Sequence, residues 1–325
     1  MAAPVTVTKR TDFDARRITP GRVISKNLFD SAEGLCYHDG AWQKLAPIVW
    51  GRFLCVMSGF FNTLPDPLPV LLLVGGLGTR MGPEAEGRPK ALIEIGGRPI
   101  VWHIMKLYAH YGHTHFVFPL GYRGDSFRRY FLDYEALTHD LTFKLGQPDQ
   151  RIYHDSNREA EWELTLFDAG VPTNKGARVR LAMERVEAQR MFVTYGDGIG
   201  DVDIKALLDF HRSHGKLATL TGYQPYSQYG LVDADADSQV RALREKPRLT
   251  NWVNAGFFVF EREVLDYLRG DDTVDLEKET LPRLAVDGQL MMHKHTGFWA
   301  SMDTFKEAQT LSEVWDKGAP WKVWK

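Results

Sequence analysis

Residues 71–90 read LLLVGGLGTRMGPEAEGRPK, and the junction inside this stretch organises the rest of the chain. An apolar run, Leu71–Val74, breaks at glycines that lead into Thr79 and Arg80. A short apolar run ending at glycines predicts a buried strand followed by a loop. Glycines let backbone N–H groups approach an anion closely, and nearby basic side chains can neutralise phosphates. The stretch therefore predicts a polyphosphate site with Arg80 and Lys90 as its cations.

Spacing excludes two common glycine-loop motifs. The P-loop requires four residues between its glycines and then Gly-Lys-Ser/Thr, which this loop lacks. The dinucleotide fingerprint G-x-G-x-x-G fails because Met81 stands where its last glycine belongs. An ordinary strand-to-loop turn with a chance arginine is the simpler alternative. The Pro89-Lys90 pair that follows weakens this alternative.

Predicted strands and helices alternate from residue 70 onward. The apolar patterns predict strands at 71–74, 115–119, 191–195 and 217–223, and helices at 100–111, 124–131, 176–187 and 204–214. This order predicts an α/β fold with a doubly wound, mostly parallel sheet. Ligands of such sheets bind beyond the carboxyl ends of the strands, where both the GGLGTR and the YGDG segments lie.

Two aspartates are candidate metal ligands. Asp197 lies between glycines at the end of the strand predicted at 191–195, and Asp303 follows about a hundred residues later in Met302-Asp303-Thr304. Two carboxylates and the phosphates of a substrate suit Mg²⁺, which keeps several waters and few protein ligands. An aspartate in a tight turn is the alternative interpretation of Asp197.

A third polar centre is Arg244-Glu245-Lys246-Pro247. Its carboxylate can accept hydrogen bonds from sugar hydroxyls, and its ammonium can bind a phosphate. An exposed charged turn is the alternative for this tetrapeptide. Asn254, which opens the apolar FFVF strand, is expected near it, and Trp299 is a candidate wall of the pocket.

Composition bounds the function classes. The 325 residues are 44% hydrophobic and 25% charged, with a formal net charge of −2 at pH 7, so a nucleic-acid binder acting through a basic surface is disfavoured. Cys36 and Cys55 are too few for a disulfide framework, and His110, His113 and His115 are expected on the surface rather than in a zinc site. No signal peptide and no membrane-length apolar span are present, so we expect a cytoplasmic protein that binds neither nucleic acid nor membrane.

Residues 1–66 form an N-terminal extension that precedes the expected catalytic domain, residues 67–325. Pro65, Pro67 and Pro69 mark the junction. The extension is either an added module or oligomer contact, or a poorly packed segment. A further interpretation is that the given start lies upstream of the true start of translation, for which Met57 is available.

The chain resembles the sugar nucleotidyltransferases, most closely the CTP:glucose-1-phosphate cytidylyltransferase branch. The segments that carry the resemblance are GGLGTRM, RPKALIEIGGRPIVWHIMKLY, VTYGDGIGDVDIKALLDFHRSHGKLATLT, REKP, VNAGFFVF, GFWASMDT and APWKVWK. They run in this order from about residue 70 to the end of the chain. The resemblance implies a Rossmann-like, nucleotide-diphospho-sugar transferase fold with a small β/α sugar-binding part.

The resemblance also implies roles for individual residues. Arg80 and Lys90 would be catalytic, and Asp197 and Asp303 would hold the Mg²⁺ cofactor. The nucleotide would contact Gly75, Gly76, Leu77, Gly78, Thr79, Gly176 and Arg178. The sugar phosphate would contact Tyr195, Gly230, Glu245, Lys246 and Asn254.

The implied reaction transfers the cytidylyl group of CTP to a sugar 1-phosphate, with α-D-glucose 1-phosphate as the expected acceptor. The enzyme is expected to form a homo-oligomer. The family's Thr-Gly-Gly-Arg is here Lys175-Gly176-Ala177-Arg178, so the nucleotide base is less firmly indicated than the reaction. Another nucleotide, a different phosphate or phosphonate acceptor, and a regulatory homologue that binds nucleotide sugar without turnover stay as alternatives.

Overall fold

The computed structural model describes residues 35–38, 41–44, 67–76, 88–154 and 159–324. The chain forms two compact units, Met1–Thr63 and Leu64–Lys325. In the first unit, β1 (Leu35–His38) and β2 (Ala41–Lys44) pair as an antiparallel hairpin. The role of residues 1–66 stays a prediction.

A seven-stranded sheet forms the centre of the second unit. From edge to edge its strands are β16 (Leu290–His295), β12 (Ala218–Tyr223), β15 (Val253–Glu261), β10 (Arg190–Tyr195), β3 (Val70–Leu73), β6 (His115–Leu120) and β9 (Glu163–Asp168). Every neighbouring pair is parallel except the two pairs that β15 makes with β10 and β12. The expected mostly parallel sheet is therefore confirmed.

The helices and small hairpins fill the connections. The helices are η5 (Lys90–Leu92), α2 (Ile100–His110), α3 (Gly124–Leu132), α4 (Tyr134–Thr138), α5 (Lys175–Arg185), α6 (Ile204–His214), η6 (Arg262–Tyr267), η7 (Leu276–Thr280), α7 (Leu281–Val286) and α8 (Phe305–Asp316). Outside the seven-stranded sheet, the described part of the second unit has four small antiparallel pairs: β4 (Glu94–Ile95) with β5 (Arg98–Pro99), β7 (Leu141–Lys144) with β8 (Gln147–Tyr153), β11 (Gly198–Gly200) with β17 (Trp299–Ser301), and β13 (Leu231–Ala234) with β14 (Val240–Arg244).

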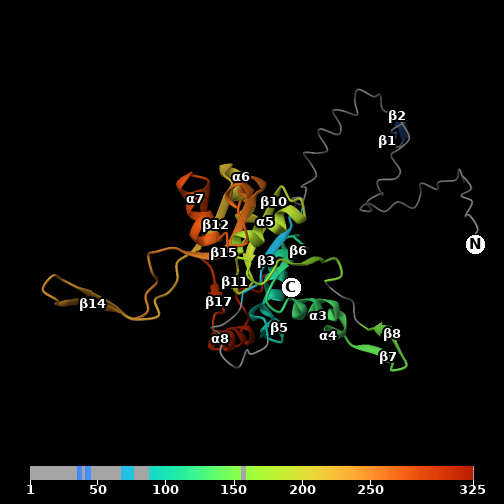
Figure 1. Ribbon diagram of the computed structural model, residues 1–325, viewed down its shortest axis with the longest axis horizontal. Helices are drawn as coiled ribbons and strands as arrows, with labels where there is room; N and C mark the ends of the chain where they lie inside the picture. Colours follow the sequence, from blue (N-terminus) through green and yellow to red (C-terminus); the bar gives the residue numbers. More distant parts are fainter. Residues whose placement is uncertain (1–34, 39–40, 45–66, 77–87, 155–158, 325) are drawn as a thin grey trace, which may run out of the picture. The chain divides into compact units, whose positions relative to one another are not determined.

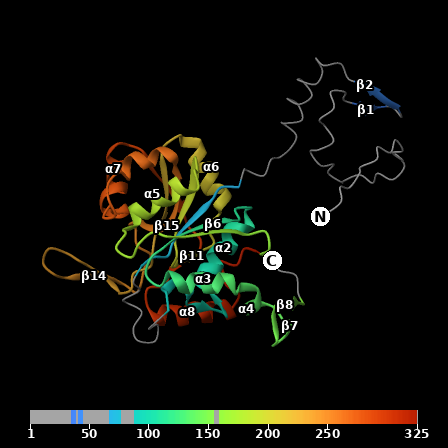
Figure 2. The ribbon, with the colours of Figure 1, turned by 45° about the vertical axis from the view of Figure 1, so that its right-hand side comes forward.

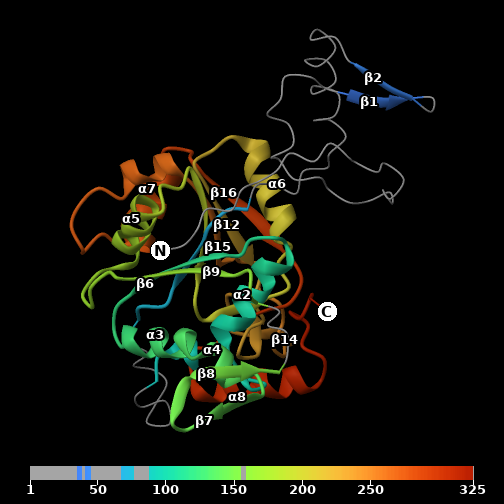
Figure 3. The same cartoon turned by 90° about the vertical axis from the view of Figure 1, so that its right-hand side faces the viewer.

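Helices cover both faces of the sheet, as Figure 3 shows. Successive side chains of a strand point to opposite faces, so the fully apolar β3 contributes side chains to the core on each face of the sheet. Val70 and Leu72 belong to a core cluster that also contains residues of α2, α6 and α8, whereas Leu71 and Leu73 belong to a second cluster that contains residues of α5 and α7. This double burial explains why the strand reads as an uninterrupted apolar run in the sequence.

Two antiparallel hairpins extend from this body. The β13–β14 hairpin projects away from the sheet (Figure 1), and its strand residues are exposed except for the half-buried Leu231. The β7–β8 hairpin lies beside α4 (Figure 2). Among the described residues, no helix combines the length and the apolar character needed to cross a bilayer.

The expectation that His113 lies on the surface is wrong. Its side chain is 1% exposed, and the backbone N–H of Leu68, just before β3, donates to its Nδ1 at 3.1 Å. Burial lowers the pKa of His113 to about 4, with a smaller contribution from the charge of Arg212. In the sequence this histidine follows a glycine at a helix end. The neighbouring residues give no sign that the segment leading into β3 contacts it.

His113 makes folding stability depend on pH. The unfolded chain takes up a proton near the ordinary pKa of 6.5, whereas the folded chain resists protonation until about pH 4. The contribution of His113 is therefore complete above pH 6.5 and is lost as the pH falls toward 4. We expect His113→Asn, whose amide oxygen can accept the Leu68 hydrogen bond, to reduce the pH slope of the unfolding free energy by up to about 1 kcal/mol per pH unit between about pH 5 and 6.5.

Urea unfolding measured across this pH range tests the prediction. The buried His103 and His211, whose pKa values are also lowered to about 4, keep part of the slope. An unchanged slope in His113→Asn would contradict the assignment.

Candidate active site

The site lies where the carboxyl ends of β3 and β10 adjoin. These two central strands are parallel neighbours, with Leu73 paired to Tyr195, and the chain leaves β3 for β6 on the opposite side. This is the point in a doubly wound sheet where connections diverge and a crevice opens. The chain after β10 comes close to the chain after β3, and position 196 must be glycine there. A Cβ added at Gly196 would lie 2.6 Å from the Val74 side chain.

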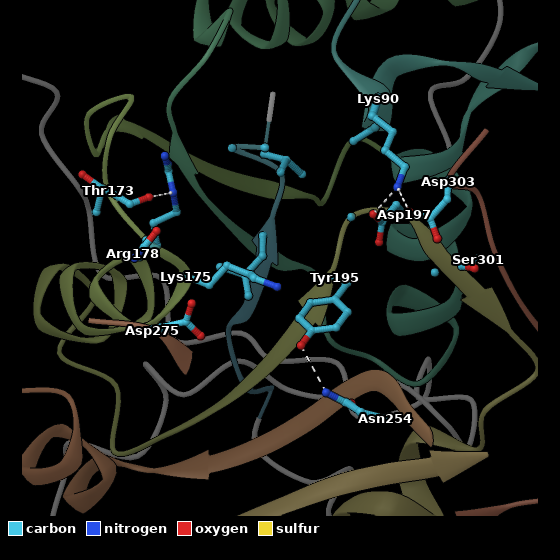
Figure 4. A pocket seen from close by; sticks show the side chains of 18 of the residues that line it. Lys90, Thr173, Lys175, Arg178, Tyr195, Asp197, Asn254, Asp275, Ser301 and Asp303 are labelled. Carbon is cyan, nitrogen blue, oxygen red and sulfur yellow. Dashed lines mark hydrogen bonds and ion pairs between the residues drawn. The ribbon is translucent and has the colours of Figure 1, made fainter. Parts of the chain in front are cut away.

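A cavity of about 770 Å³ opens at this edge. Eight residues expected at the site from the sequence line it together: Gly75, Gly76, Lys90, Arg178, Tyr195, Asp197, Asn254 and Asp303. Trp299, the expected wall residue, also lines it. Figure 4 shows the labelled side chains that surround this space.

Lys90 bridges two carboxylates in the cavity. Its Nζ lies 2.6 Å from Asp197 Oδ2 and 2.8 Å from Asp303 Oδ1 (Figure 4). Burial alone would lower the pKa of this ammonium, but the charges and hydrogen bonds of the two carboxylates outweigh burial and raise it. Lys90 is therefore a firmly charged ammonium that bridges two carboxylates.

Backbone pairing brings these distant aspartates together. Gly198, directly after Asp197, pairs with Ser301 across β11 and β17, and the Met302 N–H donates to the Asp197 carbonyl at 2.9 Å. Behind Asp303, the side chain of Glu307 accepts the backbone N–H groups of Asp303 and Thr304 in a capping box that starts α8. The carboxylates are thus fixed by a strand pair on one side and a helix cap on the other.

The arrangement fits a divalent cation. Two carboxylates from separate elements already direct oxygens at one cationic position, and the cavity in front of them leaves room for phosphate oxygens and waters. Within the described residues no cluster of three or more His, Cys, Asp or Glu side chains could hold a metal. A site with two carboxylates and substrate oxygens is what Mg²⁺ commonly uses, so Asp197 and Asp303 remain its proposed ligands.

A second polar network, centred on Tyr195, forms another wall of the cavity. The Tyr195 hydroxyl donates to Glu277 Oε1 and accepts a hydrogen bond from the Asn254 amide at 3.1 Å. Burial and then the Glu277 carboxylate raise the pKa of Tyr195, so this hydroxyl stays protonated. Lys175 pairs with the same carboxylate, and its ammonium lies 4.8 Å from the Tyr195 ring centroid. The network fixes Asn254 and Tyr195 at the edge of the cavity.

The Arg178 side chain packs against the glycine turn at Gly75. It is buried and donates to three carbonyl oxygens, those of Thr173 at 2.9 Å, Pro119 at 2.8 Å and Gly170 at 2.8 Å. Cβ atoms added at Gly75 or Gly121 would lie 2.4 Å from its guanidinium. Burial lowers the pKa of this guanidinium, while Asp168 and Asp272 act in the opposite direction. Its role in nucleotide binding stays a prediction, and this packing gives it a structural role as well.

Several expected site residues lie away from the cavity walls. Gly176 packs α5 against the segment before η7, where an added Cβ would lie 2.7 Å from the Val274 carbonyl oxygen. Gly230, Glu245 and Lys246 lie at the base of the exposed β13–β14 hairpin, with the Glu245 carboxylate 3.1 Å from a Cβ added at Gly230. Leu77, Gly78, Thr79 and Arg80 lie outside the described residues.

Several residues of the cavity were not predicted from the sequence. Thr173, Asn174, Lys175 and Asp275 line it, and Glu277 joins its Tyr195 network. The one local signal is Asp275, an acidic residue that caps the start of η7 by accepting two backbone N–H groups. Glu277 could not be identified from the sequence, since its partners lie 82 and 102 residues earlier in the chain.

Comparison with known proteins agrees with this architecture. Residues 69–310 match the protein family described as nucleotidyl transferase. The chain is 41% identical over 261 residues to glucose-1-phosphate cytidylyltransferase of Salmonella typhi, covering 79% of this chain and all of that protein. It is 36% identical over 266 residues, with the same coverage, to the Bacillus subtilis protein named "Probable glucose-1-phosphate cytidylyltransferase".

The fold also resembles a solved structure. The crystal structure of HddC from Yersinia pseudotuberculosis matches with a TM-score of 0.54 and 20% sequence identity, covering 76% of this chain and 99% of that one. Such a likeness supports the Rossmann-like α/β architecture and adds nothing about substrate.

Arg178→Lys tests the bracing role. A lysine cannot make the three carbonyl contacts, so we expect the substrate-free protein to lose about 2–4 kcal/mol of unfolding free energy in urea. Arg129→Lys is the matched control, because its side chain is 80% exposed and its ion pair within the described part of the chain is with the exposed Asp125 one turn away. The control should stay within about 0.5 kcal/mol of wild type. If Arg178→Lys were fully stable and raised only the KM for nucleotide, bracing would not be its role.

Proposed function

This chain belongs to the nucleotidyl transferase family, and we propose that it transfers the cytidylyl group of CTP to a sugar 1-phosphate, with α-D-glucose 1-phosphate as the acceptor. Membership of the family makes the chain a nucleotidyltransferase enzyme. The observation that carries the proposal is the convergence of Lys90, Asp197 and Asp303 at the β3–β10 edge. The 41% identity to a glucose-1-phosphate cytidylyltransferase supports the choice of substrates.

The reaction is an in-line displacement at phosphorus. A phosphate oxygen of the sugar 1-phosphate attacks the α-phosphorus of CTP, a new P–O bond forms, and the bond to the bridging oxygen of the β-phosphate breaks. The products are CDP-sugar and pyrophosphate. A phosphate dianion is already a nucleophile, so no general base is required. Catalysis then rests on positioning the reactants and neutralising charge.

Cationic groups at the loop side of the cavity would serve the nucleotide. Gly75 and Gly76 leave the backbone open for a close approach by phosphates, and Lys90 provides the charge beside them. We assign Leu77, Gly78, Thr79 and Arg80 to the same phosphates. Asp197 and Asp303 would hold Mg²⁺, which when bound neutralises negative charge on the α-phosphate.

The Tyr195 wall would serve the sugar phosphate. Asn254 and Tyr195 present an amide and a hydroxyl that Glu277 holds in place, which suits the recognition of sugar hydroxyls. We assign Gly230, Glu245 and Lys246 to the sugar and its phosphate as well. Gly176 and Arg178 are assigned to the nucleotide side through the position of the segment that they anchor.

A different nucleotide or acceptor is the second candidate. Lys175 stands where the related motif has threonine and lines the cavity, which adds a cation beside Tyr195. A cytoplasmic location and a homo-oligomeric assembly accompany the proposal as further predictions.

Pyrophosphate release tests the proposed reaction. The purified enzyme with Mg²⁺ is offered CTP, UTP, GTP and ATP, each with glucose 1-phosphate, mannose 1-phosphate or a phosphonate acceptor. We expect the largest kcat/KM for CTP with glucose 1-phosphate. A faster pair would replace the proposed substrates, and no release from any pair would contradict the reaction itself.

Tyr195→Phe tests the sugar wall. The substitution keeps the ring but removes the hydroxyl that links Asn254 to Glu277. We expect the KM for the sugar 1-phosphate to rise about fivefold, as for the loss of about 1 kcal/mol, with the KM for CTP nearly unchanged. Tyr226→Phe is the control, because Tyr226 is 64% exposed and does not line the cavity. An increase confined to the KM for CTP would place Tyr195 on the nucleotide side instead.

A further inference from the structure

We propose that Lys90 holds the place of the divalent cation until a nucleotide arrives, so that the metal binds effectively only together with a nucleoside triphosphate. The inference rests on the proposed function, which makes Asp197 and Asp303 the metal ligands. It adds a second role for Lys90, as a competitor of the metal before it becomes a partner of the phosphates.

The geometry of the three side chains carries the first step. One ammonium contacts both carboxylates, at 2.6 and 2.8 Å. The Lys90 side chain is 16% exposed, whereas those of Asp197 and Asp303 are 36% and 40% exposed, so the carboxylates face the cavity and the lysine fills the angle between them. The position that an ion bridging both carboxylates would take is the position of this ammonium.

Electrostatics makes the two cations exclusive. A divalent ion and an ammonium that share the same carboxylate oxygens would lie within a few ångströms of each other, where like charges repel strongly in a partly buried site. Lys90 must therefore release at least one carboxylate when a metal binds. A released ammonium on a mostly buried side chain loses a charge-assisted hydrogen bond to a carboxylate, so metal binding alone is penalised.

A triphosphate removes this penalty. The backbone at Lys90 is fixed, because η5 starts there, its carbonyl accepts the Ile93 N–H at 3.1 Å, and the neighbouring Ala91 is buried. Only the flexible four-carbon side chain can move, and it opens onto the cavity that Gly75 and Gly76 line. Phosphate oxygens there would accept the ammonium and supply further ligands to the metal. Metal and nucleotide therefore bind with positive coupling, which is reciprocal.

Binding of Mn²⁺ to the nucleotide-free protein tests the inference, with free Mn²⁺ followed by electron paramagnetic resonance. Lys90→Met removes the competing charge and keeps the length of the side chain. We expect it to bind Mn²⁺ at least about tenfold more tightly than wild type, within the range usual for coupled sites. Lys90→Gln, a second neutral variant, should behave alike and serves if the first fails to fold.

Lys175→Met is the matched control. Lys175 lines the same cavity, but its ammonium pairs with Glu277 and not with the aspartates. Removing a charge that is only nearby should tighten Mn²⁺ binding by less than about threefold, since screening weakens interactions over such separations. Equal tightening in both variants, or none in Lys90→Met and Lys90→Gln, would overturn the inference.

A further variant separates this inference from the function on which it rests. In the Lys90→Met background, Asp197→Asn should abolish the gained Mn²⁺ affinity. If the affinity persisted, the assignment of the metal ligands would be wrong, and the proposed function would lose that part. If wild type already bound Mn²⁺ tightly and lost it in Asp197→Asn, the metal site would stand and the competition by Lys90 would be contradicted.

Discussion

The ammonium of Lys90, held between the carboxylates of Asp197 and Asp303, is the contact through which the site is assembled. Its three residues come from three parts of the chain, namely η5, the turn after β10, and the start of α8. Without the central lysine, two partly buried carboxylates would repel each other. The β11–β17 pair and the capping box of α8 supply the rigidity that holds them at this distance. The fold therefore positions opposite charges before any substrate binds.

Much of this arrangement was predictable because its signals are local. The apolar run of β3 and the helical pattern of α6, predicted at 204–214 and found at Ile204–His214, follow from spacing alone. Lys90, Asp197 and Asp303 could be joined only through the family resemblance, since spacing does not show which strand ends adjoin. The contacts of Glu277 with Tyr195 and Lys175 cross more than 80 residues and carry no motif. The buried His113 and the bracing by Arg178 depend equally on tertiary packing, which overrides the local pattern.

The two walls of the cavity differ in the groups that they present. The loop side is the proposed phosphate site, and the Arg178 guanidinium, which bonds three carbonyl groups, lies close enough to Gly75 to exclude a Cβ there. The Tyr195 wall combines Lys175, Tyr195, Glu277 and Asn254 in one network of direct contacts, so we expect a change at one position to affect the others. Lys175 is also where this chain departs from the related motif.

A double-mutant cycle tests the central contact most directly. The unfolding free energies of wild type, Lys90→Met, Asp197→Asn and the double variant are measured by urea unfolding near neutral pH without substrates. Because Lys90 is mostly buried and bonds Asp197 at 2.6 Å, we expect a favourable coupling of about 1 kcal/mol between the two positions. The double variant should then lose less stability than the sum of the single ones. Additive losses would contradict the claim that Lys90 holds the acidic pair together.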